Sequence, residues 1–330
     1  QMALKTANIN LYIYTGTSGS YTSNDLKYRL TKDVIGSQGK VVIEIGELVR
    51  DYIDNSFDGT TYQSQTLWVT AAAALYHEDG SEMAESPKIY NYLAVDGFGI
   101  FEEGMNPDIG NHVMQSNDIM YVPDGDRAQI PVFAESLSNV TFYNGNANIG
   151  SQVISDNGNS NQKIQFVSPP DYCTRVVFDS TDDRQILINY ICENIHTTHD
   201  VHFFNKFGAL QKMTFFKKSE KTMSIKDKTF KSNTLDILNE NYSTNRGQTS
   251  RYNVNAKMKI TMNTGYVHES FNDVIEQMLL SEKVWINHNN QTVPVIPISK
   301  SLKYKTDVND KLINYSFDFE FAYDKFNLIR

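Results

Sequence analysis

The sequence predicts a mainly β protein made of several β-sandwich or β-barrel units. Its 330 residues include 19 Tyr and 18 Phe, and aromatic residues, with the frequent Thr, Val and Ile, favour strands. Short runs with a period of two recur along the chain, and turn residues separate them about every ten residues. The chain is longer than one typical domain, so we expect two or three domains.

Composition and charge narrow the class of protein further. Hydrophobic residues make up 40% of the chain and charged residues 21%, which is typical of ordered globular proteins. The formal net charge of −9 argues against a nucleic-acid binder, because phosphate binding needs a basic surface. No apolar run approaches the ~18 residues of a membrane span, and no secretory signal is visible. We therefore expect neither sequence-specific nucleic acid nor membrane as a partner.

Residues 1–110 are expected to form a first β domain with one short helix. The helix is predicted over Gly46–Asn55, where apolar residues recur at helical spacing. His77–Ser81 and Asp96-Gly97 have the composition of hairpin turns. The predicted strand regions are Asn10–Tyr14, Leu26–Leu30, Val41–Ile45, Thr66–Tyr76 and Tyr90–Phe101.

A second β-sandwich or barrel domain is expected over residues 111–200, after a boundary at Asn106–Asn111. Asp124-Gly125 predicts a turn flanked by strands, and Asp156–Gln162 predicts a loop. The predicted strands are Ile119–Val122, Ala128–Val132, Val140–Tyr143, Gln152–Ile154, Lys163–Val167, Thr174–Phe178 and Gln185–Ile191.

The third domain, residues 201–330, opens with the clearest hairpin of the chain, Val201–Phe216. Two apolar-alternating runs flank Asn205–Gly208, whose Asn and Gly suit the positive φ angles of a tight reversal. We expect a packing and interface hairpin, in which the alternation places one set of side chains on one face. These are Val201, Phe203, Met213 and Phe215.

The strongest helix signal lies at Glu269–Lys283, residues 269–283. Ser270 has the position of an N-cap, with Asp273 in capping-box register. The apolar stripe of this helix is Phe271, Val274, Ile275, Met278 and Leu279. Strands are predicted at Tyr252–Met262, Trp285–Ile286, Val293–Ile298, Ser301–Tyr304 and Tyr315–Tyr323. The third domain therefore reads as a sheet with one amphipathic helix packed on it.

Two stretches between these elements have distinct compositions. Residues 217–231 are rich in lysine, which is typical of a solvated edge strand whose charges block unwanted pairing. Residues 232–251 are polar and turn-rich, so we expect a long loop that becomes ordered on contact with a partner.

One cluster resembles a metal site. Cys192, His196, His199 and His202 lie within eleven residues and include the ligand types that zinc prefers. Residues three apart on a strand point to opposite faces, however, so we predict solvated histidines in a turn and no metal. Cys173 and Cys192 are expected to be free, buried thiols.

Other polar groups give no site. Asp124-Gly125-Asp126 and Asp156–Asn161 resemble calcium loops loosely, without the alternating acids and distal Glu. The paired acids Asp182-Asp183, Glu102-Glu103 and Asp51/Asp54 read as surface charge. No nucleotide, hydrolase or metalloprotease motif is present, so we expect no catalytic residues and no cofactor.

Aromatic residues near Asn-rich loops leave a second class of function open. Tyr62, Trp68 and Tyr143 could stack on sugars, while packing in the core accounts for each of them as well. A carbohydrate-binding adhesin or receptor-binding module, with a host glycan as ligand, is therefore the alternative function.

Four short sequence segments resemble virion structural proteins of tailed bacteriophages. They are Val42–Tyr52, Tyr92–Gly104, Phe203–Phe216 and Lys311–Asp324. The strand and helix order of the third domain is also similar to tail-tube-like domains of phage tail proteins. The resemblance touches all three domains and supplies no functional residues.

The resemblance implies a non-enzymatic structural subunit located in the virion. Such a protein of the tail, baseplate or neck forms homo-oligomers and binds other virion structural proteins during viral assembly. The acidic net charge is compatible with a position beside a DNA channel, where repulsion lets DNA slide.

Overall fold

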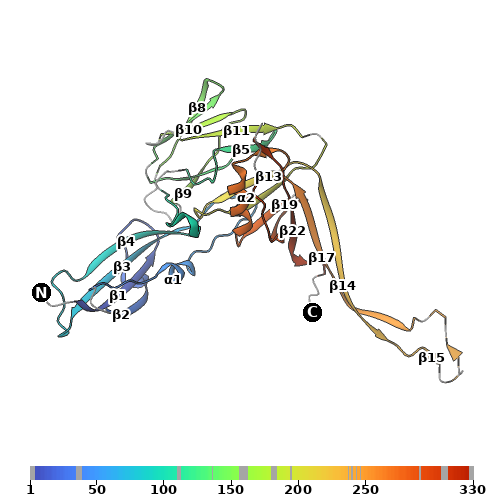
Figure 1. The fold of residues 1–330 in the computed structure, drawn as a ribbon, viewed down its shortest axis with the longest axis horizontal. Coiled ribbons are helices and arrows are strands. Elements are labelled where there is room, and N and C mark those ends of the chain that lie inside the picture. The colour runs from blue at the N-terminus through green and yellow to red at the C-terminus, as the bar shows by residue number, and fades with distance from the viewer. Residues whose placement is uncertain are drawn as a thin grey trace. The chain divides into compact units, whose positions relative to one another are not determined.

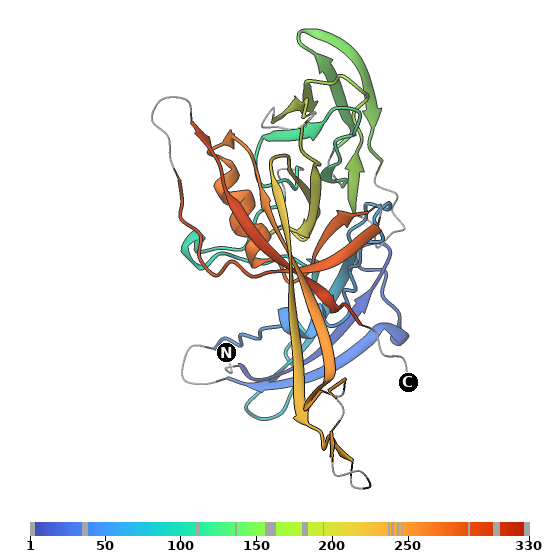
Figure 2. The same ribbon diagram turned by 90° about the vertical axis from the view of Figure 1, so that its right-hand side faces the viewer.

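The computed structural model describes most of the chain as strands, several sheets and a few short helices (Figures 1 and 2). It describes residues 4–34, 39–109, 113–135, 137–155, 163–179, 184–193, 195–236, 238, 241–242, 244–245, 247–289, 291–305 and 311–326. The protein is 50% strand and 7% helix, which confirms the mainly β, multi-sheet prediction.

The chain forms two compact units. The first contains residues 1–190 together with Phe203–Lys212, and the second contains Ile191–His202 and Met213–Arg330. The first unit holds two of the large sheets, and the second unit holds most of the third. The predicted division into three domains at residues 110 and 200 stays a prediction.

A four-stranded antiparallel sheet opens the first unit, with the order β2-β1-β3-β4. Its strands are β1 (Leu4–Tyr14), β2 (Leu26–Asp33), β3 (Thr66–His77) and β4 (Lys88–Val95). A 3-10 turn, Ser23–Asp25, precedes β2. One face buries Leu11, Ile13 and Val69 against Val49 and Ile53, which follow each other at helical spacing. The alternation of apolar residues on β1 and β3 therefore decides which face is covered.

One strand prediction in this region is wrong, and the predicted helix is present but ends five residues earlier than expected. Val41–Ile45 forms no strand: alternate residues are partly buried, but the segment pairs with no described strand. The helix is α1 (Gly46–Arg50), five residues long, because Tyr52 and Ile53 continue it only as turns bonded to the carbonyls of Val49 and Arg50. In both segments the apolar residues recur because one side of the segment is buried, although the backbone is not a strand in the first or a helix beyond Arg50 in the second.

A five-stranded sheet with the order β5-β11-β10-β7-β8 follows in the same unit. It combines β5 (Ile119–Pro123), β7 (Asn139–Asn144), β8 (Ala147–Val153), β10 (Arg175–Phe178) and β11 (Gln185–Ile191). The pair β6 (Ile130–Phe133) and β9 (Ile164–Val167) is separate, and a core of Val122, Ile130, Val140 and Phe178 is fully buried between these strands. Asp124-Gly125 is a turn as predicted, with Gly125 at a φ of 84°. The loop predicted at Asp156–Gln162 lies outside the described residues.

The predicted hairpin at Val201–Phe216 is confirmed as β12 (His199–Phe204) and β13 (Leu210–Phe215). Only Gly208 of its turn has a positive φ, 74°. Asn205 shapes the turn through its buried side chain: Oδ1 accepts from the backbone N–H groups of Phe207 and Ala209 at 3.0 and 3.1 Å. Val201, Phe203, Met213 and Phe215 are buried, as expected of packing residues, and the opposite face is covered too: every residue of both strands is buried except Asp200, which is partly buried.

The hairpin turn predicted at Asp96-Gly97 is wrong, and the turn of the Val201–Phe216 hairpin explains why. Asp96-Gly97 makes no hairpin, and instead Phe98 N–H donates to the carbonyl of Lys206 at 3.0 Å. A Cβ placed on Gly97 would lie 2.4 Å from that carbonyl oxygen, and one on Gly208 would lie 2.9 Å from the nitrogen of Asp96. The two glycines allow two backbone segments to approach closely, a role that a sequence does not separate from turn formation.

The large sheet of the second unit has the order β13-β12-β19-β20-β22-β17-β14. The strands that follow β13 are β14 (Ser219–Lys231), β17 (Thr249–Asn263), β19 (Val284–His288), β20 (Gln291–Pro297) and β22 (Ser316–Asp324). Short pairs join β15 (Leu235–Asp236) to β16 (Asn241–Tyr242) and β18 (Val267–His268) to β21 (Leu312–Ile313). Phe317, Phe319 and Phe321 alternate toward the core as the sequence predicts. Ser301–Tyr304, predicted as a strand, is not one.

The predicted helix is α2 (Phe271–Leu280), which lies against this sheet (Figures 1 and 2). Phe271, Val274, Ile275 and Met278 of the predicted stripe are buried. The capping prediction is wrong: Ser270 has helical angles, and its Oγ lies 3.0 Å from Nδ1 of His268 instead of bonding the first turn. No helix in the described part of the chain is long and apolar enough to cross a membrane.

Candidate functional site

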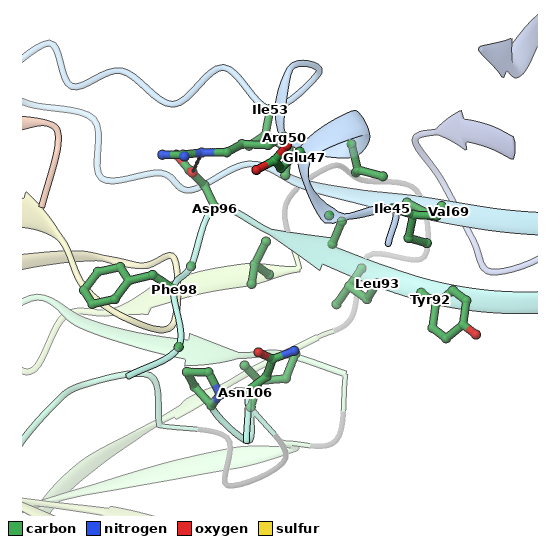
Figure 3. A pocket seen from close by; sticks show the side chains of 18 of the residues that line it. Ile45, Glu47, Arg50, Ile53, Val69, Tyr92, Leu93, Asp96, Phe98 and Asn106 are labelled. Atoms are coloured by element: carbon green, nitrogen blue, oxygen red, sulfur yellow. Dashed lines mark ion pairs between the residues drawn. The ribbon is translucent and has the colours of Figure 1, made fainter. Parts of the chain in front are cut away.

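A cavity of about 880 Å³ lies in the first unit beside strand β4 (Figure 3). One wall consists of α1 and the residues on either side of it, with Ile45, Val49 and Ile53. The opposite wall is the end of β4, where Tyr92 and Leu93 lie in Figure 3, and its continuation to Gly99. The Gly97–Gly208 approach closes the far end, because it brings Lys206 and Phe207 to the cavity.

Charged groups line one side of this cavity. Arg50 Nε lies 3.6 Å from Asp96 Oδ1, and Asn55 Nδ2 donates to Asp96 Oδ2 at 3.4 Å. Figure 3 shows Arg50 and Asp96 facing each other, with Glu47 next to them. Glu44 Oε1 accepts from the N–H of Gly46 at 3.0 Å, where α1 begins. The rim is therefore mainly carboxylate, with the charge of Arg50 already used by Asp96.

The residues that line this cavity are aliphatic, aromatic and acidic side chains for the most part. Among the described residues that line it, none is His, Cys, Ser or Thr. Its walls are aliphatic and its rim is acidic, which suits a ligand with apolar groups and positive charge. Strand β4 is an edge strand of its sheet, and Ile89, Tyr90 and Tyr92 on it are each about half exposed, at 52%, 47% and 49%.

The Cys/His cluster does not come together. Cys192 is exposed, which corrects the prediction of a buried thiol, whereas Cys173 is buried as predicted. His199 and His202 are buried in β12, so the prediction of solvated side chains is wrong for both. Nε2 of His199 lies 3.1 Å from Ser219 Oγ, and burial lowers the pKa of His199. Within the described ranges, no three His, Cys, Asp or Glu side chains are placed to hold a metal ion.

The calcium-like loop at Asp124-Gly125-Asp126 uses its second carboxylate within the fold. Asp126 Oδ2 lies 2.5 Å from Nζ of Lys212, so its charge is paired. The similar loop at Asp156–Asn161 and the acidic pair Asp182-Asp183 lie outside the described residues. Glu103 accepts from Lys206 Nζ at 2.7 Å. Both described pairings are structural contacts of the segment Phe203–Lys212.

The aromatic residues proposed for sugar stacking are used within the fold. Trp68 is 8% exposed in β3. Tyr62 packs against Phe57 and Phe166 with ring centroids 5.4 and 5.6 Å apart. The guanidinium of Arg175 lies 4.6 Å from the ring centroid of Tyr143. These contacts favour packing over sugar binding, and Tyr143 is the best remaining candidate for a glycan contact.

A second surface lies on the β14–β17 hairpin of the second unit. Strand β14 is the outer edge of the sheet, as its lysines predict. The loop predicted at residues 232–251 is confirmed in part: the pairing of the ribbon ends at Lys231 and Thr249, and the described residues between them form only the short pair β15–β16, while residues 249–251 belong to β17. Figures 1 and 2 both show β14 and β17 running side by side beyond the rest of their sheet. Four apolar side chains on this ribbon are about half exposed, Met223, Ile225, Phe230 and Tyr252.

Sequence reasoning found the edge strand and missed both apolar surfaces. The cavity is built from segments some fifty residues apart, and no local pattern marks them. On the ribbon, the alternation of Met223 and Ile225 with polar residues was a usable signal. A scan against protein-family models, a search of curated proteins and a search of solved structures each found no match to this chain.

Proposed function

We propose that this chain is a non-enzymatic structural subunit of a bacteriophage particle, in the tail, baseplate or neck. It assembles with copies of itself and with neighbouring virion proteins. The four sequence segments that resemble phage virion proteins suggest that the chain belongs to a phage particle. The observation that supports an assembly role is the β14–β17 ribbon, which exposes apolar side chains on an unpaired sheet edge.

The physical argument concerns what such a ribbon needs. A two-stranded ribbon is marginally stable alone in water, and a third strand or a covering layer stabilises it. The rings of Phe230 and Tyr252 contact each other at 5.8 Å, yet each residue remains about half exposed. Half-exposed aromatic and aliphatic groups on a free edge are typical of a surface that a partner covers.

The function then consists of binding between subunits. Sheets with buried cores provide rigid bodies, and the ribbon provides a long contact surface that reaches a neighbour. No bond is made or broken in this role. The net charge of −9 keeps the assembled protein from holding nucleic acid unspecifically.

Cryo-microscopy of purified particles, combined with mass spectrometry of their proteins, tests the proposal. We expect the chain at a defined position in the tail, baseplate or neck, in several copies and with the ribbon against a neighbour. A protein that is strictly monomeric and found outside any particle would contradict it. A glycan array with wild type and Tyr143→Ala tests the alternative, and loss of host-glycan binding in that variant would favour the adhesin.

A further inference from the structure

The β14–β17 ribbon, here called the arm and comprising Ser219–Lys231 and Thr249–Asn263, is basic. Pairing of β17 with β22 covers only Lys257–Asn263, so the outer part of the arm is two-stranded. Seven Lys or Arg and two Asp or Glu lie on it. The basic residues are Lys221, Lys226, Lys228, Lys231, Arg251, Lys257 and Lys259. The arm therefore combines positive charge with half-exposed Met223, Ile225, Phe230 and Tyr252.

The cavity beside β4, here called the groove, has the opposite character. Ile43, Ile45 and Leu93 give it an apolar lining, while Glu44 and Glu47 are exposed on its rim. Residues 1–110 as a whole contain fifteen Asp or Glu and seven Lys or Arg. The acidic excess of residues 1–110 lies in the segments that connect the strands, including the Glu44–Glu47 segment on the rim of the groove.

Both surfaces also have unpaired backbone groups. Strand β4 ends one sheet and strand β14 ends another. Lysines on β14 disfavour pairing with an arbitrary strand, because each lysine would have to be desolvated without a counter-charge. A strand edge next to carboxylates removes that penalty. The lysines therefore select an edge that has carboxylates beside it, such as the end of β4, where Glu44 and Glu47 line the groove.

We propose that the arm of one copy docks in the groove and along β4 of a second copy. This inference rests on the proposed function and names the contact through which the subunits bind. Phe230 and Tyr252, on the face of the arm that carries Lys226 and Lys228, enter the groove, and the two lysines meet Glu44 and Glu47. The two surfaces differ, so the contact is heterologous and repeats from copy to copy, which produces a ring or an open filament.

Two variants of the full chain test this contact, because one changes only the arm and the other changes only the groove. The arm variant is Lys226→Glu/Lys228→Glu/Phe230→Ser, and the groove variant is Glu44→Lys/Glu47→Lys. Glu78→Lys/Asp124→Lys has the same net charge as the groove variant and changes exposed residues away from the groove, so it serves as the matched control. Circular dichroism and thermal unfolding confirm that each variant is folded.

Sedimentation velocity and native mass spectrometry then measure association. We expect wild type and the control to self-associate, more weakly as salt rises, and each variant to weaken association roughly 100-fold. An equimolar mixture of the two variants is expected to form a 1:1 dimer and nothing larger. Only one intact arm and one intact groove can meet in that mixture.

Three results would overturn the inference: a monomeric wild type, a mixture that does not dimerise, or a control that loses association. Failure of the proposed function is separate. If the arm and groove bind but the chain is absent from particles, the contact is correct and the virion role is wrong. If the chain is in particles but the variants assemble normally, the role is correct and this contact is wrong.

Discussion

Two consecutive hairpins of this chain have opposite environments. Strands β12 and β13 are buried almost throughout, whereas in β14, which begins four residues after β13 ends, every residue after Ser219 is exposed. Both contain alternating apolar and polar residues. The pattern that predicts a strand therefore does not determine how many of its faces are covered.

The difference lies in how the polar residues are paired. In the buried hairpin, Asn205 Nδ2 donates to the carbonyl of Met114 at 2.7 Å, and Thr214 Oγ1 donates to Asp200 at 2.6 Å. Lys212 pairs with Asp126. On β14 most lysines extend into solvent. A buried strand can keep polar residues if the fold supplies partners, and an exposed strand can keep apolar residues if a partner molecule covers them.

Introducing the same charge into each hairpin gives the largest expected contrast. Phe203→Asp places a carboxylate at a fully buried position, and we expect it to cost more than about 4 kcal/mol, enough to prevent folding. Ile225→Asp, at a residue 51% exposed, is expected to change the free energy of unfolding by less than about 0.5 kcal/mol. Urea unfolding of both variants measures this, and equal effects would remove the contrast.

Asn205→Ala tests whether the buried turn depends on one side chain. The change removes four hydrogen bonds and leaves buried partners unsatisfied, so we expect a loss of about 3 kcal/mol. Asn148→Ala removes one bond to the N–H of Gly150 in an exposed turn and is expected to cost about 1 kcal/mol or less. Similar urea midpoints for the two variants would contradict this.

The close approach of two backbone segments is tested by a pair of glycines. Gly208 and Gly125 both have positive φ angles, 74° and 84°, so replacement by Ala strains both by about 1 kcal/mol. At Gly208 the new Cβ would also meet the backbone of Asp96 at 2.9 Å, while at Gly125 nothing lies within 4 Å. We expect Gly208→Ala to be about 2 kcal/mol less stable than Gly125→Ala in thermal unfolding.

The smallest expected effect concerns pH, where the two hairpins meet at His199 and Ser219. Burial first, and then the charge of Lys221, lowers the pKa of His199, so the folded state takes up its proton at lower pH than the unfolded state does. The stability that follows is present above about pH 6.5 and is lost as pH falls through the lowered pKa. Urea unfolding between pH 5 and 8 should show this slope, and His199→Gln should reduce it. An unchanged slope in the variant would assign the effect to another group, such as His288, whose pKa burial also lowers.

Elements with one covered face were predictable from the sequence. In Ser316–Phe321, three phenylalanines are buried and Ser316 and Asp318 are exposed, so the period of two is visible. The same rule fails at both extremes. Thr249–Arg251 is exposed or half-exposed and polar, so the sequence predicts the end of a loop where the strand in fact begins. Val41–Ile45 has the period without strand neighbours, because its backbone is not paired.

The groove was not predictable. Ile43, Glu47 and Asp96 come together only because α1 covers one sheet face and because Gly97 admits the turn that carries Gly208. Each of these residues has an ordinary local role, and the contact joins positions about a hundred residues apart. A single sequence contains no periodic signal for such a contact.

Phe203–Lys212 belongs to the first unit, whereas the residues directly before and after it belong to the second, and this has a consequence for protein synthesis. Leu210 N–H donates to Ser64 at 3.0 Å, and Gln211 accepts from Ser116 at 2.8 Å, so the first unit needs residues that are translated after part of the second. On the ribosome, the first unit therefore cannot complete its packing until Lys212 has left the exit tunnel. A nascent chain ending at residue 200 would hold Ser64, Met114 and Ser116 without the segment that pairs with them, and we expect it to recruit chaperones until that segment emerges.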